Sequence, residues 1–280
     1  MSKTENSLFH EMSVNGSTIN PLFQLCDSDK QEIEKMSQDD VCKQVDSLRE
    51  LLEYAGKKCS IYRFLINHFE GEIKQLDEED NDYAVKRWRE LLQTHIKVYD
   101  LMGYLTLLQM DAITSCISLY IAKSDTERIM LCKHSYTIIY EAVNTNIFKT
   151  VSSKMQKYPD DILNKDKLSI YWRGIKKVLK YLSNIDEAKI IRHNLDAHKN
   201  PSFTVQIDAY QKCRWSQSIT NLQLLMTVIE SLQECMDVVN KNMRVVIDSF
   251  FEKLKERVRK LDQLKEMLLN FDEGKIEMHI

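Results

Sequence analysis

The sequence predicts an all-α protein, a bundle of long antiparallel helices that ends in a long C-terminal helix. Glycine and proline, which punctuate turn-rich β architectures, number only 6 and 3 in 280 residues. Apolar residues recur at spacings of three and four over most of the chain, which is the period of an amphipathic helix. Capping residues such as Ser124 stand just before such segments.

The first part of the chain is expected to form a tail followed by N-terminal helices. Residues 1–26 are rich in Ser, Asn and Thr without helical periodicity, and they lack the basic start and apolar run of a secretory signal. We expect a flexible tail there. Residues 27–82 are expected to pack on the core, with helix signals from Ser28 and one long helix over 40–76 that would bend at Gly56.

A second long helix is expected over 83–122, forming a hairpin with the first, because the acidic run at 77–82 separates the two. Its part at 101–122 is apolar, but Asp111 at the centre argues against a membrane span and for a buried core helix. The next helix should begin at Asp125, because Ser124 and Glu127 have the spacing of a capping box.

The second half of the chain is also expected to be mainly helical. Helices are predicted at 167–183 and 186–196, an extended piece at 203–207, and a helix over 209–269. The C-terminal helix extension, 242–280, is either a short coiled coil or a helix packed on the body. Its apolar residues fall near heptad spacing, and they are Ile247, Phe251, Leu254, Val258, Leu261 and Leu268.

Charge and cysteine content narrow the class of protein. The chain has 39 Lys plus Arg and 42 Asp plus Glu, and a net charge of −3 excludes a globally basic nucleic-acid binder. Residues 150–214 nevertheless hold 13 basic and 7 acidic residues, so a local basic surface is expected. Seven scattered cysteines fit free thiols in the reducing cytoplasm.

The densest group of titratable side chains is IIRHNLDAHKN at 190–200, at the end of a predicted helix. It contains Arg192, His193, Asp196 and His198. An arginine can hold a phosphate, and a histidine can transfer a proton near neutral pH. These groups suffice for RNA cleavage by the 2′-hydroxyl. Such a reaction needs no metal and no other cofactor.

This stretch resembles the motif of the HEPN superfamily: an arginine, a polar residue (Asn, Asp or His), and a histidine three to five residues further on. Arg192, His193 and His198 fit. The resemblance covers roughly 83–241 and implies a HEPN-like core that acts as a metal-independent endoribonuclease. It also implies a homodimer that joins two motifs. Asn200 stands where members paired with a nucleotidyltransferase have a tyrosine, so the chain departs from that subtype.

The resemblance also implies roles for residues and a biological setting. Arg192 and His198 would be catalytic, His193 would orient, and Asp196 would either orient a histidine or pair with Arg192. The setting would be phage defence or growth arrest as a toxin, with an antitoxin or regulatory protein as a possible partner. Because residues six apart on an ideal α-helix point about 120° away from each other, Arg192 and His198 require a helix end between them or two protomers.

A basic helix face before the motif would bind the RNA backbone, or would be an ordinary solvated face. Its members are Arg173, Lys176, Lys177 and Lys180. As exposed site residues, Arg192 and His198 should contribute little to stability. Three further polar residues lie near apolar stripes, where they would cap helices, form surface pairs, or complete the pocket: Asp111, Arg128 and Glu141.

Two other interpretations of the motif remain open. Arg192 and Asp196 have the spacing of a surface ion pair, and His198 would then interact with the helix dipole. The chain would in that case be a non-catalytic helical module that binds RNA or another protein.

Overall fold

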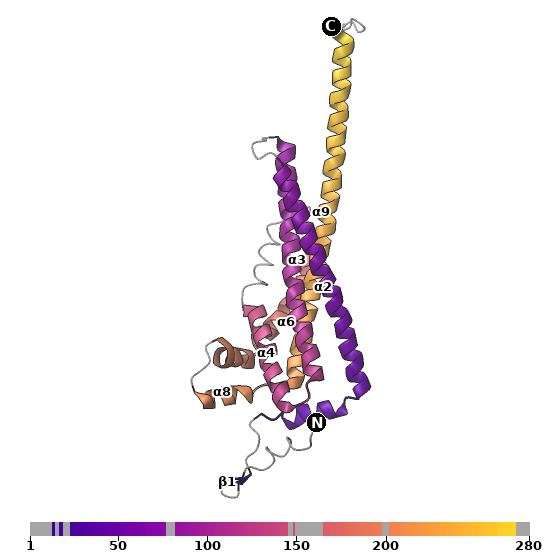
Figure 1. Cartoon of the computed structure of the whole chain (residues 1–280). Helices are drawn as coiled ribbons and strands as arrows, with labels where there is room; N and C mark the ends of the chain where they lie inside the picture. The colour runs from indigo at the N-terminus through magenta and orange to yellow at the C-terminus, as the bar shows by residue number, and fades with distance from the viewer. Residues whose placement is uncertain are drawn as a thin grey trace. The chain divides into compact units, whose positions relative to one another are not determined.

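The computed structural model describes residues 13–14, 17–18, 23–76, 82–144, 148, 165–197 and 202–272. Within these residues the chain is helical, apart from short connections and a small antiparallel pairing of β1 (Ser13–Val14) with β2 (Ser17–Thr18). The predicted all-α helical bundle is therefore confirmed (Figure 1). Most of the predicted tail, 1–26, lies outside the described residues.

The longest helices lie before and after the motif, and the helices directly beside it are short. A π-helical turn, η1 (Arg192–Ala197), follows α7 directly. The helices are α1 (Asp27–Lys35), α2 (Gln38–Gln75), α3 (Tyr83–Ile121), α4 (Asp125–Asn144), α6 (Lys165–Ser183), α7 (Asp186–Ile191), α8 (Phe203–Tyr210) and α9 (Trp215–Asp272).

The chain divides into two compact units. Unit 1 comprises Met1–Gly56, Leu108–Ile147 and Val178–Val228. Unit 2 comprises Lys57–Leu107, Phe148–Lys177 and Ile229–Ile280. The candidate motif therefore belongs to unit 1.

Side-chain caps explain where the central helices begin. Ser37 Oγ accepts the Asp40 amide at 3.1 Å at the start of α2. Ser124 Oγ accepts the Glu127 amide at 3.2 Å, and Glu127 Oε2 accepts the Lys123 amide at 2.8 Å. The predicted start of α4 at Asp125 is thus confirmed, with the return bond of the capping box going to Lys123 instead of Ser124.

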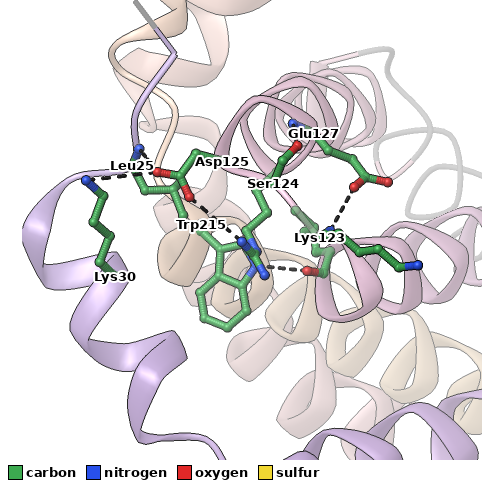
Figure 2. A network of polar contacts seen from close by, with 9 residues as sticks. Leu25, Lys30, Lys123, Ser124, Asp125, Glu127 and Trp215 are labelled. Carbon is green, nitrogen blue, oxygen red and sulfur yellow. Dashed lines mark hydrogen bonds and ion pairs between the residues drawn. The ribbon is translucent and has the colours of Figure 1, made fainter. Parts of the chain in front are cut away.

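The core of unit 1 joins α3, α4 and the first part of α9. The indole Nε1 of Trp215 donates a 3.0 Å hydrogen bond to the carbonyl of Leu119. The Asp125 carboxylate accepts the Leu25 amide at 3.2 Å and lies 4.0 Å from Lys30 Nζ, which ties α1 to the start of α4 (Figure 2). Around these contacts, apolar side chains are excluded from solvent: Ile113, Leu119, Tyr136, Ile139, Leu222 and Leu225.

Unit 2 contains the predicted hairpin of α2 and α3, with the second part of α9 packed on it. The rings of Tyr62 and Tyr99 stack at 5.9 Å, and Phe69 packs against His95 at 5.2 Å. These contacts confirm the hairpin. The Tyr99 hydroxyl also accepts a 2.9 Å hydrogen bond from the side-chain amide of Asn240 on α9.

Helix α3 is, within the described part of the chain, the one helix long and apolar enough to cross a membrane by length and composition. Half of the most apolar stretch of 18 residues in this helix is buried inside the protein. Leu92 and Leu105 are fully buried in unit 2, and Ile113 and Leu119 are fully buried in unit 1. The helix therefore serves as a core helix, as the sequence predicted.

Two predictions for the segment after the motif are wrong. Residues 203–207, predicted to be extended, begin α8, because Ser202 caps this helix and Ile207 is buried on it. Packing of this kind overrides the strand preference of β-branched residues. The helix predicted over 209–269 is interrupted between α8 and Trp215, where α9 begins.

Candidate functional site

Three short segments of unit 1 place the motif. Helix α7 and the turn η1 both pack on α4, and α8 packs on η1. The buried side chains of Ala188, Ile191 and Leu195 anchor α7 and η1 to the core. The remaining residues of the turn are then held at the surface of unit 1, where Arg192 and His193 begin it.

Arg192 is held by an ion pair with α4. Its Nε donates a 2.6 Å hydrogen bond to Oε1 of Glu141. The side chain of Arg192 is 23 % exposed and that of Glu141 is 43 % exposed. Arg192 was expected to be exposed, whereas its side chain is only partly exposed and is paired with Glu141 of α4.

One nitrogen of this guanidinium is buried. Arg192 Nη1 is buried and has no hydrogen-bond partner among the described residues. A buried donor left without an acceptor costs about 1–3 kcal/mol. An anionic oxygen that reached Nη1 would remove this cost.

His193 lies beside Arg192 and is exposed. Its ring meets Tyr140 edge to face, with centroids 5.9 Å apart. Two consecutive residues of α4, Tyr140 and Glu141, thus contact two consecutive residues of η1. This arrangement fixes the direction of the arginine and leaves the imidazole accessible.

The structure accounts for part of the predicted site. It brings Arg192 and His193 together in η1, whereas His198 lies outside the described residues. The backbone of Asp196 belongs to η1, but its side chain lies outside them as well. Because η1 is a π-helical turn with i→i+5 hydrogen bonds, the angle of about 120° expected between residues six apart on an ideal α-helix does not apply over 192–197.

Glu141 was one of three polar residues expected to cap a helix, form a surface pair or complete the pocket. It forms a pair with Arg192, 51 residues later in the chain, and the sequence did not identify this partner. Opposite charge was the only available signal, and many residues share it. Arg128 does form a local pair, 3.8 Å from Asp125, and Asp111 is exposed.

The predicted basic face lies on α6, opposite the buried residues Ile175 and Leu182. Its four cations are exposed. Lys180 belongs to unit 1 with the motif, whereas the other three belong to unit 2: Arg173, Lys176 and Lys177.

Neither a metal site among the described residues nor a similar known protein indicates a function for this chain. The described residues contain no group of three or more His, Cys, Asp or Glu side chains able to hold a metal ion. No family model matches the chain, and no curated protein or solved structure matches it.

Proposed function

We propose that the chain is a metal-independent endoribonuclease of HEPN type whose site contains Arg192, His193 and His198. The observation that carries the proposal is the placement of Arg192. It opens a π-helical turn, is held through Nε by Glu141, and has a buried Nη1 without a partner among the described residues. Short π-helical turns occur often at functional sites. A guanidinium fixed through Nε presents its other donors to a phosphate.

In the proposed reaction the 2′-hydroxyl of RNA attacks the adjacent phosphorus and displaces the 5′-oxygen of the next nucleotide. His198 transfers a proton at the 2′-oxygen or at the leaving 5′-oxygen. Arg192 stabilises the negative charge that builds on the phosphate. The products are a 2′,3′-cyclic phosphate and a 5′-hydroxyl. His193, next to Arg192, orients the substrate or the arginine.

The proposal includes a setting and partners. The chain would act in the cytoplasm as a two-fold homodimer that brings two motifs together around one RNA. Phage defence or growth arrest would be its role, and an antitoxin or regulatory protein would control it. The basic residues of α6 would bind the RNA backbone.

A cleavage assay with purified protein tests the proposal. Single-stranded RNA is incubated with the chain in the presence of EDTA, and the ends of the products are identified. We expect 2′,3′-cyclic phosphate ends, no cleavage by Arg192→Ala or His198→Ala, and partial cleavage by His193→Ala. Arg49→Ala and His68→Ala are matched controls at exposed positions of α2, and they should cleave normally.

Two results would contradict this function. The first is RNA left intact by the wild-type chain, and the second is full activity of His198→Ala. A chain that is only monomeric in light scattering at micromolar concentration would contradict the composite site.

A non-catalytic interaction module is the second candidate function. In unit 2, Ile61 and Phe64 of α2 are 55 % and 69 % exposed. Apolar side chains exposed close together are typical of surfaces that bind another protein. RNA that is neither bound nor cleaved, together with normal folding, would favour this candidate.

A further inference from the structure

In unit 2, α9 runs antiparallel along α3 in a constant register. Gln233 Nε2 donates to Thr106 Oγ1 at 2.9 Å, the Asn240 side chain donates to the Tyr99 hydroxyl at 2.9 Å, and the ring of Phe251 meets that of Trp88 at 5.1 Å. From one contact to the next, the number of residues advanced along α9 equals the number of residues moved back along α3. Continuing this register places Glu256 opposite the first residue of α3.

The end of α9 therefore extends beyond the helix that it packs on. Helix α3 begins at Tyr83, whereas α9 continues to Asp272. Residues 257–272 add about 24 Å of helix at 1.5 Å per residue, and they form the yellow end of α9 in Figure 1. After Val239, no described side chain of α9 is buried. Isolated helices of this length are marginally stable in water.

The sequence of this end has the heptad pattern of a coiled coil. Leucine occupies three d positions, Leu254, Leu261 and Leu268, and Val258 and Lys265 occupy a positions. A β-branched residue at a with leucine at d favours two parallel strands. A single lysine at a also specifies register and the number of strands. Phe251, at the preceding a position, packs on Trp88, so the same seam begins within the chain.

The charges beside the seam are complementary between two copies of this helix. Arg257 lies at g and Asp262 at the following e position. In a parallel pair, g of one helix faces the following e of the other, and such pairs set partner and orientation. On the outward face, Lys260 and Glu256 form an ion pair within the helix, with Lys260 Nζ 2.9 Å from Glu256 Oε1.

We infer that residues 257–272, which extend beyond α3, pair with the same segment of a second copy as a parallel two-stranded coiled coil. The second copy is the fitting occupant because the seam and the Arg257–Asp262 charges are self-complementary. The inference is independent of RNA cleavage, since it uses no residue of the Arg192 site. It also gives each protomer an interface outside unit 1.

Disulfide crosslinking in the full-length chain tests this pairing directly. Leu268→Cys places a thiol at a d position, where two parallel strands bring the same residue together. Gln263→Cys, at the outward f position, is the matched control. The wild-type chain is a second control, because its own cysteines, including the exposed Cys42, could form crosslinks. After oxidation, we expect a covalent dimer of Leu268→Cys and much less of Gln263→Cys.

Two further variants separate pairing from a general change in the helix. Leu261→Asp added to Leu268→Cys should abolish the crosslink, whereas Gln263→Asp should leave it. Arg257→Asp and Asp262→Arg should each weaken the crosslink, and their combination should restore it. Circular dichroism verifies that the body remains folded. The inference is overturned by equal crosslinking at 268 and 263, by none at 268, or by a crosslink that survives Leu261→Asp.

Discussion

The carboxylate of Asp29 accepts a 2.8 Å hydrogen bond from the backbone amide of Trp215, 186 residues later in the chain. It also accepts the Ser216 amide at 3.3 Å and the Ser216 hydroxyl at 2.6 Å. Asp29 is 1 % exposed. A residue of α1 thus caps the first turn of α9, where helix amides lack partners within the helix.

Removing this cap should destabilise unit 1. Asp29→Ala leaves buried amide hydrogens without an acceptor, and we expect the free energy of unfolding to fall by about 3 kcal/mol. Asp27→Ala is the matched control, because Asp27 is exposed in the same helix. Urea unfolding followed by circular dichroism measures both. Equal losses for the two variants would contradict the capping role.

The Glu141 side chain should support RNA cleavage by holding Arg192. Glu141→Ala removes the acceptor of the 2.6 Å bond, so the rate of cleavage should fall. Glu141→Gln keeps an oxygen there and should lose less. Because this pair is partly exposed, stability should change by only about 1 kcal/mol. The cleavage rate should decrease in the order wild type, Glu141→Gln, Glu141→Ala. Melting temperatures are measured for the same proteins, and Glu90→Ala is the control at an exposed position.

The salt dependence of RNA affinity should show whether the basic residues of α6 contact phosphates. If Lys176 and Lys180 contact phosphates, each change to alanine should reduce the slope of log affinity against log salt by about 1. Lys253→Ala, at an exposed position of α9, should leave the slope unchanged. Fluorescence anisotropy with labelled RNA between low and moderate salt measures these slopes. Binding that does not respond to salt would rule out a phosphate-binding face.

Acid should weaken unit 2 through His95, which is 6 % exposed between Phe69 and Tyr99. Burial lowers the pKa of His95 from 6.5 to about 4. Between these values the unfolded chain binds a proton that the folded chain does not, so stability is complete above pH 6.5 and falls as pH drops toward 4. At pH 5 the loss should be about 2 kcal/mol.

Urea unfolding at pH 7.5 and 5 measures this effect. His95→Gln should lose less stability between the two pH values, because glutamine does not titrate. His134→Gln, at an exposed position of α4, should behave like the wild-type chain. Equal pH dependence in all three proteins would exclude His95 as the cause.

Local signals explain the parts of the fold that the sequence predicts. The start of α4 follows from Ser124 and Glu127, which lie within one turn, and the hairpin follows from apolar spacing on either side of an acidic loop. The prediction of an extended piece at 203–207 was wrong because Val205 and Ile207 favour strands when considered alone. The burial of Ile207 depends on the rest of unit 1, whereas the Ser202 cap is local and could have indicated the helix.

The candidate site shows the same limit. The types and spacing of Arg192 and His193 mark them in the sequence as candidates for phosphate chemistry. Their surroundings depend on α4, since Tyr140 and Glu141 reach them only after the chain has folded. No local pattern separates Glu141 from other acidic residues. Backbone hydrogen bonds that are one residue longer than in an α-helix also leave no mark in side-chain periodicity.

The turn η1 makes the site sensitive to the number of residues in it. Its hydrogen-bonded rings contain one residue more than those of an α-helix. Deleting Asn194 would bring Leu195 one residue closer to Arg192 along the helix, so the two side chains could not both keep their present directions. Such a deletion would turn either Leu195 from the core or Arg192 from Glu141, while leaving both side chains chemically intact. The length of this turn, like its composition, is therefore a property that insertions and deletions at this position must preserve.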